Sequence, residues 1–273
     1  MIITDNHMHL SEKGLHIEAS KQFQRAGGTH LILVHNPDFS KKISDFEKAF
    51  KKTIILSERI NKETQVTSYP IVGLHPAEFV NLTKKFSLKE SVEFAIDVYE
   101  TAGNFVSERK AIGLGEAGTP HFEVLKEIYD ASLEVLKFVL KLSSELDCAV
   151  HLHTESLTEE KYILFGKLIQ ENGKPKRVIK HFSPPLIELS NVNYMMPSVI
   201  GTKDNVIEAI SQSSEFLMET DYIDDPKRPG AVVGPKTVPK TTKRLLEDGF
   251  LTKEHVLRIH KENVERIYGI SLE

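Results

Sequence analysis

Eight short apolar runs alternate with helical patterns along this chain, and this alternation constrains its fold more than any other feature. Apolar runs bounded by polar turns predict β-strands, whereas apolar residues three or four positions apart predict helices. The expected strands cover residues 2–7, 29–35, 66–75, 110–116, 148–153, 177–182, 192–199 and 216–221. Helices are expected at 40–62, 88–102, 122–146, 158–172 and 204–211, with two closing helices at 237–249 and 252–269.

Strand and helix units that repeat in this way predict a parallel sheet, and eight of them predict an α/β fold of the (β/α)8 barrel type. Barrels of this size usually form one domain, so we expect the 273 residues to make a single barrel domain over 1–273.

The charges of the chain nearly balance, with 35 Lys and Arg against 39 Asp and Glu. This balance excludes the broad positive field of a protein that coats nucleic acid. It favours a small substrate, or one that the protein contacts only locally. A single cysteine, Cys148, allows no disulfide framework and favours a reducing compartment. We expect a cytoplasmic protein without a membrane segment, because no stretch approaches about 18 uninterrupted apolar residues. The oligomeric state stays open.

Histidines and carboxylates gather at the ends of the expected strands. His7 and His9 lie two positions apart, and alternate residues of a strand point to the same side, so both can face the barrel mouth. Further candidates follow other expected strands: Glu116, His153, His181 and Asp221. Because barrel active sites lie at the carboxyl ends of the strands, these residues should converge. Imidazole and carboxylate ligands suit zinc, manganese or similar divalent ions.

Several motifs, taken in their order along the chain, resemble those of the amidohydrolase superfamily and, within it, the TatD-related hydrolases, commonly described as metal-dependent deoxyribonucleases. They are Asp5-x-His7-x-His9-Leu10, Gly73-Leu74-His75-Pro76, Gly115-Glu116-Ala117-Gly118, Val150-His151-Leu152-His153-Thr154-Glu155, His181-Phe182-Ser183 and Glu219-Thr220-Asp221. The resemblance implies two divalent metal ions (Zn, Mn, Mg or Co). One would be held by His7, His9 and Asp221 and the other by His153 and His181, with Glu116 as the bridge.

The implied activity is hydrolysis of a phosphoester, either at DNA ends or in a small molecule, by a metal-activated hydroxide. Asp221 would accept the proton of the attacking water, and Glu116 would act with it at the reaction centre. Three departures from the family pattern alter the expected phosphate contacts: Glu155 replaces an arginine, Thr119-Pro120 replaces an acidic residue, and Ser11 replaces the acidic residue expected after His9-Leu10. A carboxylate at position 155 repels an anionic substrate unless it is paired.

Three more residues are candidates for contact with the substrate: His75, His151 and Glu155. His151 also competes with His153 as a metal ligand, and we favour His153 because it lies nearer the end of its strand. Two other functions stay open. The same metal centre could hydrolyse a lactone, an amide or a phosphotriester, and a barrel can also serve as a non-catalytic scaffold.

Overall fold

Among the described residues nine strands form one sheet, in which the first eight follow one another in chain order and the ninth lies beside the first. The computed structural model describes residues 1–174, 177–229 and 231–273. All paired strands run parallel, as expected where helices return the chain between them. The strands are β1 (Thr4–His9), β2 (His30–Val34), β3 (Thr67–Val72), β4 (Gly113–Gly118), β5 (Ala149–His153), β6 (Val178–Ser183), β7 (Met195–Ile200), β8 (Leu217–Glu219) and β9 (Tyr222–Ile223). The predicted α/β barrel is confirmed.

The ring of strands closes where the last predicted strand is divided in two. β8 pairs with β7, with Glu219 opposite Ile200, whereas β9 pairs with β1, with Tyr222 opposite Met8. Between them Asp221 adopts a left-handed φ of 44°, which interrupts the extended backbone. The strand predicted at 216–221 therefore ends at Glu219, a second short strand follows it at Tyr222–Ile223, and Asp221 lies between the two where the barrel closes.

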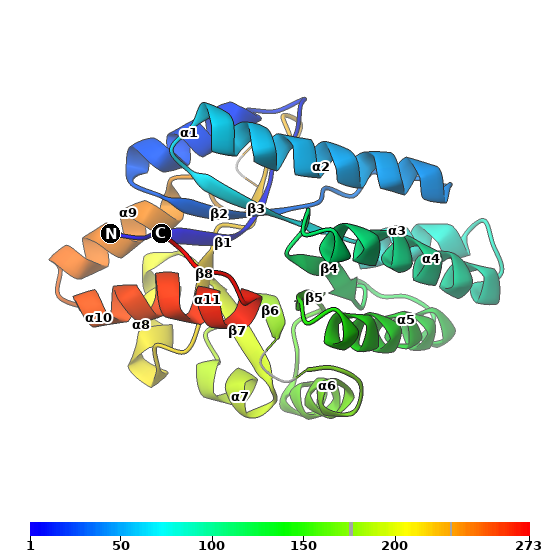
Figure 1. Ribbon diagram of the computed structural model, residues 1–273. Coiled ribbons are helices and arrows are strands. Elements are labelled where there is room, and N and C mark those ends of the chain that lie inside the picture. Colours follow the sequence, from blue (N-terminus) through cyan, green and yellow to red (C-terminus); the bar gives the residue numbers. More distant parts are fainter. Residues whose placement is uncertain (175–176, 230) are drawn as a thin grey trace.

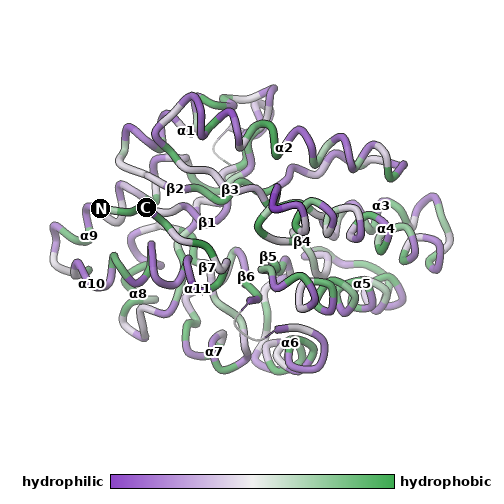
Figure 2. Tube along the Cα trace, in the orientation of Figure 1, coloured by the Kyte–Doolittle hydropathy of each residue, from purple (hydrophilic) through white to green (hydrophobic). Residues whose placement is uncertain are grey.

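Helices surround the strands on the outside of the barrel (Figure 1). Figure 2 shows hydrophobic and hydrophilic residues alternating along these helices, as expected when one face of each helix packs inward. Within the described ranges the helices are α1 (Ile17–Ala26), α2 (Ile43–Glu63), α3 (Pro76–Thr83), α4 (Leu88–Ser107), α5 (Lys126–Glu145), α6 (Glu159–Asn172), α7 (Ile187–Val192), α8 (Lys203–Gln212), α9 (Thr237–Glu247), α10 (Lys253–Leu257), the π-helical turn η1 (Arg258–Glu262) and α11 (Asn263–Tyr268).

Side chains inside the barrel change from apolar to ionisable along the strands. Ala149, His151 and His153 share one face of β5, and Ile179 and His181 share one face of β6, because alternate residues point to the same side. The first residue of each set belongs to an apolar cluster built from six different strands and the C-terminal segment. The barrel is thus filled with apolar side chains at one end and holds its histidines at the other.

The structure differs from the predicted elements in three helices and several boundaries. The sequence pattern missed α1, α3 and α7, the last two of which have only 8 and 6 residues. The third strand ends at Val72 rather than at 75, because His75 caps the start of α3. The helix predicted at 122–146 begins at Lys126, and the strand predicted at 192–199 begins at Met195, because Val192 still belongs to α7.

The two predicted closing helices are present, and the second is interrupted by the π-helical turn. Within that turn His260 is buried, and its Nδ1 accepts a hydrogen bond of 3.2 Å from the backbone N–H of Thr4. The imidazole therefore joins the C-terminal segment to β1.

Across the described part of the chain, no helix combines the length and the apolar character that crossing a membrane would require. Cys148 is buried, and burial raises the pKa of its thiol to about 12, so the thiol stays protonated and unreactive.

Candidate metal centre

The six predicted metal ligands converge at the carboxyl ends of the strands. Five of them are buried, and His153 is nearly so. They lie on β1 (His7 and His9), β4 (Glu116), β5 (His153), β6 (His181) and the break after β8 (Asp221). Residues that are far apart in the sequence are thus brought within contact distance at one edge of the sheet.

Hydrogen bonds determine which ring nitrogen of His9 carries the proton. Its Nδ1 lies 3.2 Å from the carbonyl oxygen of Val34, and a carbonyl can only accept. Nδ1 therefore carries the hydrogen, and the lone pair is on Nε2, which points to the centre. This is the form in which a neutral imidazole binds a metal ion.

A chain of buried hydrogen bonds orients His7 in the same way. Asn6 donates from Nδ2 to Ser198 Oγ at 2.9 Å and accepts at Oδ1 from the Tyr268 hydroxyl at 2.7 Å. Because its hydrogen is used there, the Tyr268 oxygen accepts from His151 Nε2. His151 Nδ1 then accepts from His7 Nδ1 at 3.0 Å, which leaves the lone pair of His7 on Nε2.

These tautomers place two lone pairs against each other. Nε2 of His7 lies 3.0 Å from Nε2 of His9, and Glu116 Oε2 is 3.3 Å from the latter. Asp221 Oδ1 stands 3.9 and 3.8 Å from the same two nitrogens. When both rings are neutral, these four acceptor atoms have no hydrogen between them and repel one another, and a cation among them removes that repulsion.

A second group of candidate ligand atoms lies beside the first. His181 Nδ1 donates to Glu219 Oε1 at 3.2 Å, so Nε2 is the nitrogen that faces the centre and that would offer its lone pair to a metal ion on losing its proton. That nitrogen is 3.0 Å from Glu116 Oε1 and 3.1 Å from His153 Nδ1, and His153 Nδ1 is 2.9 Å from the same carboxylate oxygen. The donor set of two imidazoles and a carboxylate suits a divalent ion.

Glu116 lies between the two groups, with one oxygen facing each of them. Oε2 faces His9, and Oε1 faces His153 and His181. Burial opposes ionisation of this carboxyl group, but the surrounding imidazoles hold its pKa well below its usual range. An ionised carboxylate in this place has the geometry of a bridge between two cations.

The electrostatics of the site also favour cations. Burial disfavours a charge on His181, yet the carboxylates of Glu116 and Glu219 outweigh this and raise its pKa to about 10. The negative potential is thus strong enough to hold a proton on a buried imidazole. A divalent ion carries more charge into the same potential, so the residues present fit a metal.

His75 approaches the centre as a hydrogen-bond donor rather than as a ligand. Its Nδ1 accepts from the backbone N–H of Ala77 at 3.0 Å as the cap of α3, and burial lowers its pKa to about 3. The neutral ring therefore carries its hydrogen on Nε2, which lies 3.9 Å from Glu116 Oε1. At that separation one water or substrate oxygen can sit between them.

Asp5 holds the first strand and the last strand in register. Its carboxylate accepts hydrogen bonds from Thr220 N at 3.0 Å, Thr220 Oγ1 at 2.7 Å and His7 N at 3.2 Å. Asp5 lies two residues before His7, and Thr220 directly precedes Asp221. The contact therefore joins the two chain segments that meet where the ring of strands closes. Asp5 therefore positions two predicted ligands without touching the centre.

The structure corrects the expected role of His151. Its side chain is fully buried, and both ring nitrogens are used by His7 and Tyr268, so neither is left for a substrate. His151 supports His7 instead. Glu155 lies at the edge of a cavity, paired with Lys161 and with the hydroxyl groups of Tyr129 and Thr119.

Three residues that contribute to the site received no role from the sequence. Glu219 binds His181, Tyr268 binds His151, and His121 Nδ1 lies 2.8 Å from His153 Nε2. Only Glu219 carried a usable signal, because a carboxylate two positions before Asp221 at the end of an apolar run requires a partner.

Comparison with known proteins identifies the family of the chain. The family model described as TatD related DNase matches residues 4–269. The uncharacterized protein MJ1127 of Methanocaldococcus jannaschii is 39% identical over 275 residues, which cover 99% of this chain and 97% of that protein.

Solved structures share the fold at lower identity. YJJV, a TatD homologue from Escherichia coli, has a TM-score of 0.67 at 20% identity, with 98% of each chain covered. A mutant of an organophosphorus hydrolase has a TM-score of 0.69 at 12% identity, with 98% of this chain and 92% of that chain covered. With a family match over nearly its whole length, the chain belongs to the TatD-related DNase family, whose members are metal-dependent hydrolases.

Proposed function

We propose that this protein hydrolyses phosphoester bonds with two divalent metal ions. His7, His9 and Asp221 would hold one ion, and His153 and His181 would hold the other. Glu116, which lies between the two groups, would be shared by both ions and so take part in the reaction centre. The observation that carries the proposal is the position of Glu116, whose two oxygens face two separate groups of imidazole nitrogens.

When bound, the two ions lower the pKa of a water molecule and offset the negative charge of the phosphate oxygens. The protein supplies the proton transfers. Burial raises the pKa of Asp221 to about 6, so this carboxylate is mostly ionised at neutral pH and can accept the proton of the attacking water. The same group then returns that proton to the oxygen of the leaving group.

His75 contributes orientation. Its Nε2–H points to the space beside Glu116 Oε1, where it can donate to an oxygen of the substrate. Because its other nitrogen is fixed by the backbone of α3, the donor is oriented before the substrate binds.

The test of the proposal is the variant Asp221→Asn, measured with bis(4-nitrophenyl) phosphate after reconstitution with zinc or manganese. We expect turnover to fall by roughly 10²- to 10⁴-fold, because the amide cannot accept a proton. Asp225→Asn is the matched control: Asp225 is a nearby aspartate that pairs with Arg228 on the surface, and its loss should leave turnover unchanged.

Metal content of the purified protein is measured alongside turnover. About two ions per chain, diesterase activity and inhibition by inorganic phosphate would support the proposal. Full turnover by Asp221→Asn would exclude the assigned role of Asp221. Turnover of lactones or amides alone would move the function to the wider amidohydrolase superfamily.

A further inference from the structure

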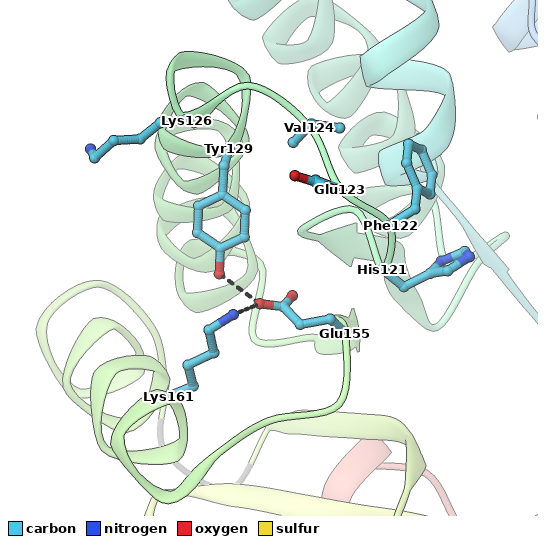
Figure 3. Close-up of a pocket in the computed structure, with 8 residues that line it drawn as sticks. All are labelled: His121, Phe122, Glu123, Val124, Lys126, Tyr129, Glu155 and Lys161. Carbon is cyan, nitrogen blue, oxygen red and sulfur yellow. Dashed lines mark hydrogen bonds and ion pairs between the residues drawn. The ribbon is translucent and has the colours of Figure 1, made fainter.

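A cavity of about 440 Å³ opens beside His153 and is large enough for a small-molecule group. Its wall is formed by the loop after β4, the start of α5, the loop after β5 and the start of α6 (Figure 3). His121 lines the cavity and contacts the far nitrogen of His153, a predicted metal ligand. A group bonded to a substrate at the metal centre can therefore extend into this cavity.

Glu155 lies in the cavity wall, and its negative charge is fully paired. In Figure 3 the side chains of Tyr129 and Lys161 converge on it from α5 and α6. Oε1 accepts from Lys161 Nζ and, at 3.0 Å, from the Tyr129 hydroxyl, while Oε2 accepts from Thr119 Oγ1 at 2.8 Å. The side chain is only 18% exposed. Three donors thus keep an ionised carboxylate in place and neutralise it.

The cations of the cavity wall are also paired. Among the described residues that line it, Lys161 is paired with Glu155 and Lys126 with Asp130 of the same helix, Glu123 adds a second carboxylate, and none is an arginine. An anionic group entering the cavity would find no unpaired cation and no bidentate phosphate partner.

Two exposed aromatic side chains lie next to residues of the metal centre or their contacts. Phe122, in the cavity wall, is 43% exposed, and its ring packs edge-on against His121. Phe182 is 49% exposed next to His181, and its backbone is held at a left-handed φ of 47° by a 2.7 Å hydrogen bond from its N–H to Glu219. An exposed ring in the cavity wall, and a second exposed ring held beside His181 on a strained backbone, favour an apolar ligand.

We propose that this cavity binds the leaving group of the substrate, that it selects an uncharged aromatic or apolar group, and that Glu155 sets this preference. The proposal rests on the phosphoester hydrolase function proposed above. Hydrolysis breaks the phosphorus–oxygen bond: water gives its hydroxyl to phosphorus, and its proton passes through Asp221 to the leaving oxygen. An uncharged alcohol or phenol is released into the cavity. An extended polyanion such as a nucleic acid strand is disfavoured there.

Binding to the metal-free protein tests the cavity without catalysis. Phenol and benzoate share a ring and differ in charge, and their binding can be compared by saturation-transfer NMR. We expect wild-type protein to bind phenol in preference to benzoate. Glu155→Arg should shift the ratio of affinities towards benzoate by about tenfold, since it removes a negative charge and adds a positive one. Glu155→Gln, which only frees Lys161, should shift it less.

The matched control is Glu171→Arg, which alters another glutamate paired with a lysine of α6, outside the cavity wall. This variant should keep the wild-type ratio. Equal binding of phenol and benzoate by the wild type, or an unchanged ratio in both Glu155 variants, would overturn the proposal.

Kinetics on the reconstituted enzyme separate this proposal from the proposed function. Methyl phenyl phosphate and methyl 4-carboxyphenyl phosphate differ in the charge of the leaving group. We expect kcat/KM to favour the phenyl ester and Glu155→Arg to reduce that preference by about tenfold. No turnover of either ester by the metal-loaded wild type would exclude the phosphoesterase function. Turnover of both with the same preference in wild type and Glu155→Arg would exclude only the role of Glu155.

Discussion

Tyr268→Phe should weaken metal binding although Tyr268 touches none of the predicted ligands. The hydroxyl joins two buried hydrogen bonds, one from His151 Nε2 and one of 2.7 Å to Asn6 Oδ1. Each such bond contributes about 0.5–1.5 kcal/mol, so the variant should lose about 1–3 kcal/mol of unfolding free energy. Without the hydroxyl, His151 can carry its hydrogen on either nitrogen, and His7 is no longer held with its lone pair towards the metal. Loss of such a supporting partner typically lowers metal affinity by about 10- to 100-fold.

Two measurements check this prediction: competition for zinc against a fluorescent chelator, and urea unfolding of the metal-free protein. Tyr162→Phe is the matched control, because Tyr162 is also fully buried but its hydroxyl has no hydrogen-bond partner within the described residues. That variant should keep wild-type zinc affinity and stability. If Tyr268→Phe binds zinc as tightly as the control does, the hydrogen-bond chain does not determine the tautomer of His7, and the reasoning is refuted.

Acid should destabilise the protein partly through His260, since burial lowers the pKa of this imidazole to about 4 from the usual 6.5. The unfolded chain binds the proton first, so stability is unaffected above pH 6.5 and falls by up to about 1.4 kcal/mol per pH unit as the pH drops from 6.5 to 4. Urea unfolding measured across this range should show that the unfolding free energy of His260→Gln falls less steeply with decreasing pH than that of the wild type. An equal slope in both proteins would contradict the role given to His260. Chelation of the metal should lower the melting temperature by about 5–10 °C. An ion present at 100 times its Kd adds about 2.7 kcal/mol to the unfolding free energy, and each kcal/mol shifts the melting temperature of a chain of this size by about 2–4 °C. Calorimetry with and without a chelator measures the shift, which Glu116→Gln should largely abolish.

The barrel and the positions of the predicted ligands could be read from the sequence because both depend on local periodicity. Alternation of apolar runs with helical patterns predicted the strand order, and residues two apart on one strand, such as His7 and His9, had to share a face. In a parallel barrel all strands present their carboxyl ends at one edge, so candidates at those ends converge whatever their spacing in the chain. Short helices such as α3 and α7 escaped prediction because one or two turns carry too little periodic signal.

The chemistry of each ligand depends on contacts that no local pattern contains. His151 and His153 share one face of a strand, and the sequence distinguishes them only by their distance from its end. The packed barrel places the first against His7 and the second beside Glu116. The Tyr268 hydroxyl reaches an asparagine 262 positions away, and Glu155 is neutralised by residues from two different helices.

The sequence by itself therefore determined which residues reach the mouth of the barrel, since strand periodicity and the direction of the chain specify that much. Only the tertiary structure decided which nitrogen of each histidine carries a proton and which charges are paired. Both follow from hydrogen bonds of about 3 Å between distant segments, which exist only once the ring of strands has closed.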